Sequence, residues 1–295
     1  MIKINAKINL SLRILAKQGA LHILDTIMMN VPQLYDIVSI KMRTDRRIIL
    51  HMTALPNFAQ CQLHLLRHLS DNYQYNTAYK AAKLLQDKYN LCGLDIHLTK
   101  GIPMQAGLGG SAAAAAGVIN LLDSMCSLQL STRDKMDLGL QLGADVPYML
   151  IGGCVRQVDN QLHSIDSNVK QHNLIVLSNS QGISTRDCFD KFAREFARYS
   201  QIHDNDKLCD MLVNCSCIDS SWSEYVYNEL TQPSISLDFN IAKSIELLQY
   251  SGAIVANMTG SGSACFGIYP TSVDVYQIVK QLQSQCNYVY ACTVA

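Results

Sequence analysis

The 295-residue chain lacks an excess of charge of either sign, because 24 Lys and Arg residues balance 24 Asp and Glu residues. A nucleic-acid binder usually shows a basic excess or a basic stripe, so nucleic acid is not an expected partner. The chain also lacks an uninterrupted apolar run of about 18 residues, which argues against a membrane span. Its first seven residues contain no apolar signal-peptide core. These absences predict a soluble, cytoplasmic protein.

Cysteine is plentiful, but its pattern lacks the marks of a disulfide framework. The 11 cysteines are odd in number, form no CxxC pair, and come close together only at Cys215 and Cys217. In a chain of this length without a secretion signal, such cysteines are typically reduced and serve as small apolar filler. Neither tetrahedral ligand spacing nor a nearby histidine pair indicates zinc. We therefore expect free thiols and no metal held by the protein.

Composition favours a folded protein with two closely packed domains. Apolar residues make up 48% of the chain and charged residues only 16%, which excludes a disordered class. A length of 295 residues is large for one hydrophobic core. Periodicity predicts helices over 77–89, 111–124 and 132–142, and strands over 94–99, 173–178 and 288–294. Because helices and strands do not alternate regularly, the sequence favours an α+β fold over a doubly wound sheet.

Glycine is concentrated in two segments of the chain. Ten of the 16 glycines lie between Gly93 and Gly153, and four more lie between Gly252 and Gly267. Glycine gathers where the backbone must turn with positive φ or approach a ligand closely. The two segments therefore predict two loops that converge on one site.

The first glycine segment, Lys100–Ser111, is followed by five alanines. A strand, a glycine loop and a helix are expected in this order, with Ser111 as the helix cap. Backbone N–H groups and the helix dipole would then bind an anion such as a polyphosphate. Between residues 101 and 132 the only charged side chain is Asp123, so nothing acidic in the loop repels phosphate. The pattern matches neither the P-loop nor the dinucleotide fingerprint, and a tight turn without a ligand is the alternative.

Three weaker features are candidates for the chemistry. Asp145 follows a predicted helix among apolar neighbours and could act as a general base if a cation lies near it, although a helix cap is the alternative. Lys7 lies in an apolar strand, where it could bind phosphate if it faces inward or be solvated if it faces outward. The second glycine segment, 257–267, joins two apolar strands and could be a plain hairpin turn.

Taken together, these segments resemble the GHMP kinase superfamily in their usual order along nearly the whole chain. The resemblance rests on Ala6–Leu10, Lys100–Ser111, Gly143–Pro147 and Thr259–Gly262. It implies a two-domain α+β fold, with a ribosomal S5 domain 2-like domain over 1–160, a ferredoxin-like domain over 161–295, and the active site between them. It also implies a kinase that uses ATP and Mg²⁺ on a small molecule, as a monomer or a homodimer.

Within the superfamily, the chain is most similar to kinases that phosphorylate the 2-hydroxyl of a cytidine-diphosphate-linked methylerythritol in the non-mevalonate isoprenoid pathway. The segment 182–185 and Asn76 ahead of an alanine pair carry this closer resemblance. One alternative is another GHMP kinase, acting on homoserine, mevalonate or a sugar. A second is a degenerate relative that binds nucleotide without turnover. Leu21 and Ala112 favour the latter, because the family usually has tyrosine and serine at these positions.

The resemblance also implies roles for individual residues. Asp145 would be the general base and Lys7 its cationic neighbour. Asn9 would contact the sugar alcohol, His22 would bond to the cytosine, and Phe189 would stack on it. The residues implied to bind ATP, with the first two near the adenosine, are Asn76, Lys100, Pro103, Gly107, Leu108, Gly109, Gly110, Ser111, Gly260, Ser261 and Gly262.

Overall fold

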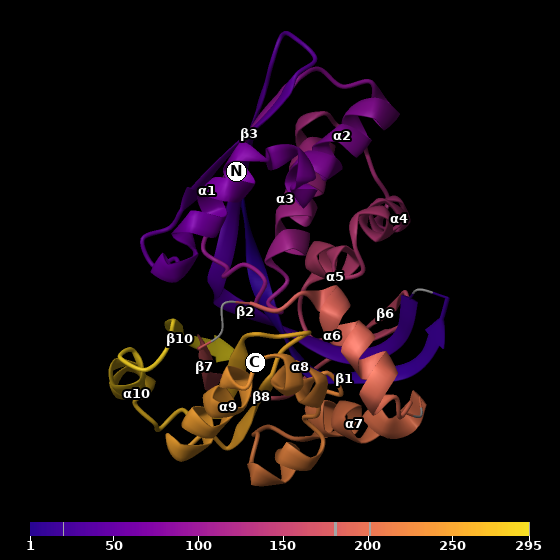
Figure 1. The fold of residues 1–295 in the computed structure, drawn as a ribbon. Coiled ribbons are helices and arrows are strands. Elements are labelled where there is room, and N and C mark those ends of the chain that lie inside the picture. Colours follow the sequence, from indigo (N-terminus) through magenta and orange to yellow (C-terminus); the bar gives the residue numbers. More distant parts are fainter. Residues whose placement is uncertain (20, 180–181, 201, 295) are drawn as a thin grey trace. The chain divides into compact units, whose positions relative to one another are not determined.

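The computed structural model describes residues 1–19, 21–179, 182–200 and 202–294 (Figure 1). The chain divides into two compact units. Unit 1 consists of residues 1–6, 34–104 and 109–152, and unit 2 consists of residues 7–33, 105–108 and 153 onward. The strands β1 (Ile2–Gln18) and β2 (Leu21–Met42) each contribute to both units. Because the units alternate along the chain, the domain division at residue 160 stays a prediction about the order of family domains.

Unit 1 contains a sheet in which β4 occupies a central place. β4 (Leu94–Lys100) pairs antiparallel with residues 37–42 of β2 and parallel with β3 (Ile48–Ala54). A parallel pair needs a crossover connection, which here contains η1 (Gln60–Gln62), α1 (Leu63–Asp71), η2 (Tyr73–Tyr75) and α2 (Thr77–Tyr89). Buried and more exposed residues alternate along β4, so one side of the sheet is apolar.

The helix α3 (Gly110–Met125) forms the interior of unit 1. Eleven of its 16 residues are buried, and it packs against α2 and α5 (Val146–Ile151). Its alanines and Gly117 make this close packing possible, because a Cβ at Gly117 would lie 2.7 Å from a methyl carbon of Val38. α4 (Thr132–Leu142) begins at a capping box between Ser131 and Asp134. The helices predicted over 77–89 and 132–142 are confirmed at both ends.

Unit 2 is built around an antiparallel sheet of four strands. These are β7 (His172–Ser178), β8 (Val255–Met258), β9 (Cys265–Tyr269) and β10 (Tyr288–Val294), in the spatial order β10-β7-β9-β8. Counted along the chain, this order is 4-1-3-2, with helices between the first and second strands and between the third and fourth. That is the ferredoxin-like topology, so the prediction is confirmed.

The remaining elements of unit 2 surround this sheet in sequence. Residues 25–28 of β2 pair with β5 (Val155–Val158), which pairs with β6 (Gln161–Ser164). The helices are α6 (Thr185–Lys191), the π-helical turn η3 (Phe192–Phe196), η4 (Ile202–Asn205), α7 (Asp206–Asn214), η5 (Ser220–Glu224), α8 (Thr231–Leu237), α9 (Asn240–Tyr250) and α10 (Val275–Leu282). Side chains of β7, β9, α9 and α10 share one apolar core. Among the helices described, none has both the length and the apolar character needed to cross a membrane.

Candidate active site

The start of α3 presents backbone N–H groups that no side chain of the described residues caps. Its N-cap residue is Gly109, with φ of 76°, and no acidic residue lies in the first turn. The prediction of Ser111 as the cap is wrong, because the left-handed conformation of Gly109 starts the helix earlier. The Ser111 hydroxyl instead lies 2.9 Å from the hydroxyl of Thr77. An uncapped and uncharged helix N-terminus of this kind is suited to an anion.

Lys100, at the end of β4, forms an ion pair with Asp36 of β2. The two side chains are only 4% and 0% exposed. The carboxylate of Asp36 also accepts hydrogen bonds from the N–H groups of Gly101 and Ile102, at 2.9 and 3.0 Å. The Lys100 ammonium lies 3.5 Å from the carbonyl oxygen of Gly110. The pair therefore anchors both the beginning of the glycine loop and the first residue of α3.

The middle of the loop is held by Gln62 of η1. Its side-chain amide donates to the carbonyl of Met104 and accepts from the N–H of the same residue, both at 2.8 Å. Pro103 and Met104 are buried. This two-way contact fixes the backbone where the loop turns toward residues 105–108.

The second glycine segment is the turn of the β8–β9 hairpin, and within unit 2 it contacts the first glycine segment. A Cβ at Gly107, where φ is 73°, would lie 2.1 Å from the carbonyl oxygen of Thr259 and 3.2 Å from the nitrogen of Gly262. A Cβ at Gly260 would lie 2.9 Å from the Cα of Gly107. Such an approach is possible only without side chains. The prediction that the two glycine segments converge is therefore confirmed.

Lys7 and Asn9 of β1 are both buried and lie in the same polar network of unit 2. Asn9 Oδ1 accepts hydrogen bonds from Lys7 Nζ at 2.5 Å and from the Thr259 hydroxyl at 3.2 Å. Asn9 Nδ2 donates to the Thr26 hydroxyl at 2.8 Å. The backbone N–H of Lys7 donates to the carbonyl of Leu108 at 3.1 Å. The amide of Asn9 is thus fixed with its oxygen toward the Lys7 ammonium, and Lys7 faces inward.

The sequence analysis did not assign roles to two threonines of this network. Thr259 has no exposed surface, and its hydroxyl also accepts the backbone N–H of Asn9 at 3.0 Å and lies 3.3 Å from the carbonyl oxygen of Gly107. Thr26 donates to the carbonyl of Ser11 at 2.6 Å. The only available signal was that each is a hydroxyl residue beside apolar strand residues, where a buried hydroxyl needs a partner.

His22 of β2 and Phe189 of α6 lie together, as an aromatic substrate site would require. Their rings stack with centroids 4.9 Å apart, and the Phe192 ring meets His22 edge-on at 6.2 Å. Burial lowers the pKa of His22 from 6.5, and the positive charge of Lys17 lowers it further against the opposing effect of Asp190. The imidazole is therefore neutral at neutral pH. Its buried Nε2 has no hydrogen-bond partner among the described residues.

Asp145 occupies the N-cap position of α5, but its side chain accepts no capping hydrogen bond from the described helix. The alternative role as a helix cap is therefore wrong for the carboxylate. The side chain is half-buried, and the short helix that follows begins with Val146 and Pro147. The role of general base stays a prediction.

The other predicted residues have local partners. Asn76 caps α2, since its side-chain oxygen accepts the N–H of Ala78 at 2.9 Å. The hydroxyl of Ser261 lies 2.9 Å from that of Thr185 in unit 2. The departure from the family at Leu21 concerns a side chain that lies outside the described residues.

Comparison with protein families and curated relatives gives a consistent result. A model of the GHMP kinases N terminal domain matches residues 76–153, and a model of the GHMP kinases C terminal domain matches residues 199–287. A 4-diphosphocytidyl-2-C-methyl-D-erythritol kinase from Clostridium tetani is 30% identical over 98% of each chain. A putative kinase of the same name from Streptococcus equi subsp. zooepidemicus is 31% identical, over 97% of this chain and 95% of its own.

Solved structures share the fold. A crystal structure of 4-(cytidine 5'-diphospho)-2C-methyl-D-erythritol kinase has a TM-score of 0.73 at 22% identity, covering 100% of this chain and 98% of the other. Mevalonate kinase of L. major, in complex with R-mevalonate, has a TM-score of 0.69 at 15% identity, covering 99% of this chain and 94% of the other. These likenesses confirm the two-domain GHMP kinase fold. With the full-length relatives, they establish that the chain belongs to the GHMP kinases, in the family of the 4-diphosphocytidyl-2-C-methyl-D-erythritol kinases.

Proposed function

We propose that this chain transfers the γ-phosphoryl group of ATP to the 2-hydroxyl of 4-diphosphocytidyl-2-C-methyl-D-erythritol, a step of the non-mevalonate isoprenoid pathway. Relatives of that name, at about 30% identity over nearly the whole chain, support the acceptor. The observation that carries the proposal is the neutral imidazole of His22, stacked on Phe189 with its buried Nε2 unpartnered among the described residues. Such a nitrogen beside an aromatic ring suits a heterocycle such as cytosine.

ATP, the phosphoryl donor of the GHMP kinases, would bind with its phosphates at the start of α3. Gly107 to Ser111 offer backbone N–H groups there, and Gly260 to Gly262 support Gly107 through the contacts described above. We propose that the nucleotide enters as its Mg²⁺ complex. Mg²⁺ needs few protein ligands when phosphate oxygens hold it, and the described residues contain no cluster of three metal-binding side chains. Asn76 would lie near the adenosine, with Lys100 supporting the loop through Asp36.

Phosphoryl transfer requires positioning and charge neutralisation more than covalent chemistry. We propose that Asp145 accepts the proton of the 2-hydroxyl and that Lys7 offsets the negative charge that develops. Asn9 was expected to contact the sugar alcohol, but both atoms of its amide already have protein partners. We therefore propose that Asn9 orients the Lys7 ammonium.

ADP release measured with four acceptors tests this function. We expect turnover with 4-diphosphocytidyl-2-C-methyl-D-erythritol and little with mevalonate, homoserine or galactose. Phe189→Ala should raise the KM of the cytidine substrate about 2- to 10-fold, the scale of a lost aromatic stack, and leave the KM of ATP unchanged. Faster turnover of another acceptor would indicate a different GHMP kinase. ATP binding without turnover of any acceptor would indicate the degenerate relative.

A further inference from the structure

Two exposed histidines lie in contact on one side of the sheet of unit 1. His51 of β3 and His97 of β4 are direct partners in the parallel pair, and both side chains are exposed. Their rings stack with centroids 4.7 Å apart and planes inclined by 20°. Neighbouring strands are roughly 4.8 Å apart, so the backbone itself holds the two imidazoles side by side.

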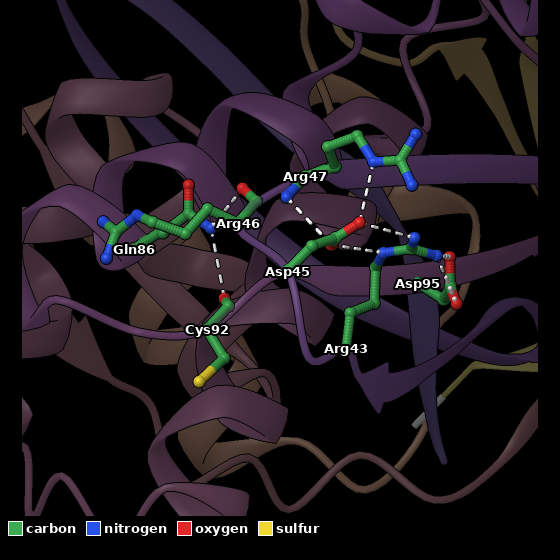
Figure 2. A network of polar contacts seen from close by, with 7 residues as sticks. All are labelled: Arg43, Asp45, Arg46, Arg47, Gln86, Cys92 and Asp95. Carbon is green, nitrogen blue, oxygen red and sulfur yellow. Dashed lines mark hydrogen bonds and ion pairs between the residues drawn. The ribbon is translucent and has the colours of Figure 1, made fainter.

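The groups around this pair leave the imidazole nitrogens to solvent. Thr53 and Thr99, the next partners along the same side, bond to each other at 3.1 Å. Asp95 is two residues before His97, but its carboxylate is held by Arg43 at 2.9 and 3.0 Å, as Figure 2 shows. Arg43 in turn binds Asp45 in the turn after β2. Neither imidazole forms a hydrogen bond or an ion pair with any residue that the structure describes.

We propose that His51 and His97 form a two-imidazole site for a divalent late transition-metal ion of the Ni²⁺, Cu²⁺ and Zn²⁺ class. Imidazole nitrogen is a preferred ligand of these ions. Two nitrogens bound at about 2.05 Å and at a right angle lie roughly 2.9 Å apart, which the stacked rings reach by inclining their edges toward each other. Water completes the coordination, since no third metal-binding side chain joins the pair among the described residues.

This site differs in chemistry from the nucleotide site. Mg²⁺ prefers oxygen ligands and would stay with the ATP phosphates, whereas the histidine pair offers only nitrogen. A metal ion bound to both rings would link β3 to β4 and stabilise unit 1, because the two ligands are neighbours only in the folded chain.

A second histidine pair provides a matched control. His64 and His68 are four residues apart on α1, which places both exposed side chains on the same helix face. Their rings make no contact with each other in the described structure. Binding at this pair must therefore first restrict two freely rotating side chains, which costs entropy that the stacked pair has already lost on folding.

Titration calorimetry of the tag-free protein with Ni²⁺ tests the proposal. Ni²⁺ is the suitable probe because exposed cysteine thiols would reduce Cu²⁺ and bind Zn²⁺. We expect one tight equivalent in the wild type. His51→Gln and His97→Gln should each weaken it by about 10²-fold or more, since the second imidazole acts at high effective concentration. A His64→Gln/His68→Gln double variant should retain the tight equivalent.

The thermal unfolding of the same proteins gives a second measurement. Ni²⁺ should raise the unfolding temperature of the wild type and of the His64/His68 control, but not that of His51→Gln or His97→Gln. Circular dichroism without metal checks that each variant is folded. Unchanged Ni²⁺ affinity in either strand variant would overturn the proposal, as would loss of the tight equivalent in the helix control.

Discussion

Replacing Asp36 by asparagine should destabilise unit 1 through the charge of Lys100. The substitution keeps a side-chain oxygen for the N–H groups of Gly101 and Ile102 but removes the negative charge. Since the side chains of Lys100 and Asp36 are 4% and 0% exposed, the ammonium would be left buried without a counter-charge. Breaking a buried pair in this way costs about 3–5 kcal/mol. That is a large part of the roughly 5–15 kcal/mol by which proteins are stable.

Urea unfolding of a double-mutant cycle measures this effect. Asp36→Asn and Lys100→Met should each lower the free energy of unfolding, whereas the double variant should recover most of the loss because neither charge remains unpaired. The KM of ATP should also rise in the folded Asp36→Asn variant, since the pair anchors both ends of the glycine loop. A loss below about 1 kcal/mol in Asp36→Asn, or strictly additive losses in the double variant, would refute the reasoning.

Three further predictions follow from the site. Gly107→Ala should raise the KM of ATP strongly, because its Cβ would lie 2.1 Å from the carbonyl oxygen of Thr259; an unchanged KM in the folded variant would contradict the close contact. Thr259→Val should lower kcat by up to about 10²-fold by releasing Asn9 and with it Lys7, and Thr259→Ser should restore it; equal kcat values for the two variants would contradict a role of the hydroxyl. The pKa of His22 is lowered from 6.5 on folding, so the unfolded state binds the proton more readily and stability should fall as the pH drops through and below that value; unfolding measured between about pH 8 and 5 should show a weaker pH dependence in His22→Gln, and identical pH profiles would contradict the shift.

The elements that sequence predicts best are those whose signal is local. The helix over 77–89 has apolar residues at helical spacing and a capping asparagine, and the helix over 132–142 has a complete capping box, so both ends of each could be predicted. The strand over 288–294 was confirmed in the same way. The convergence of the two glycine segments was also predictable, because glycine marks close backbone approach wherever it gathers.

Contacts between distant residues could not be predicted in the same way. Asp36 is 64 positions from Lys100, and an acidic residue in an apolar strand shows only that some partner exists. Thr259 is 250 positions from Asn9, and their bonds depend on how β1 and the β8–β9 turn come together within unit 2. The six-residue helix α5 after Asp145 is too short to show a helical period, which is why its N-cap position left two roles open.

The central claim is that this chain phosphorylates the 2-hydroxyl of 4-diphosphocytidyl-2-C-methyl-D-erythritol with Asp145 as the base. Phosphorus NMR of the wild-type reaction with ATP tests it directly. The γ-phosphate signal should be replaced, in equal amount, by a phosphate monoester on the tertiary 2-hydroxyl. Asp145→Asn should form this product about 10²- to 10⁴-fold more slowly, the usual contribution of a general base, while still binding ATP. Consumption of ATP without the monoester, or product formation by Asp145→Asn at the wild-type rate, would contradict the account.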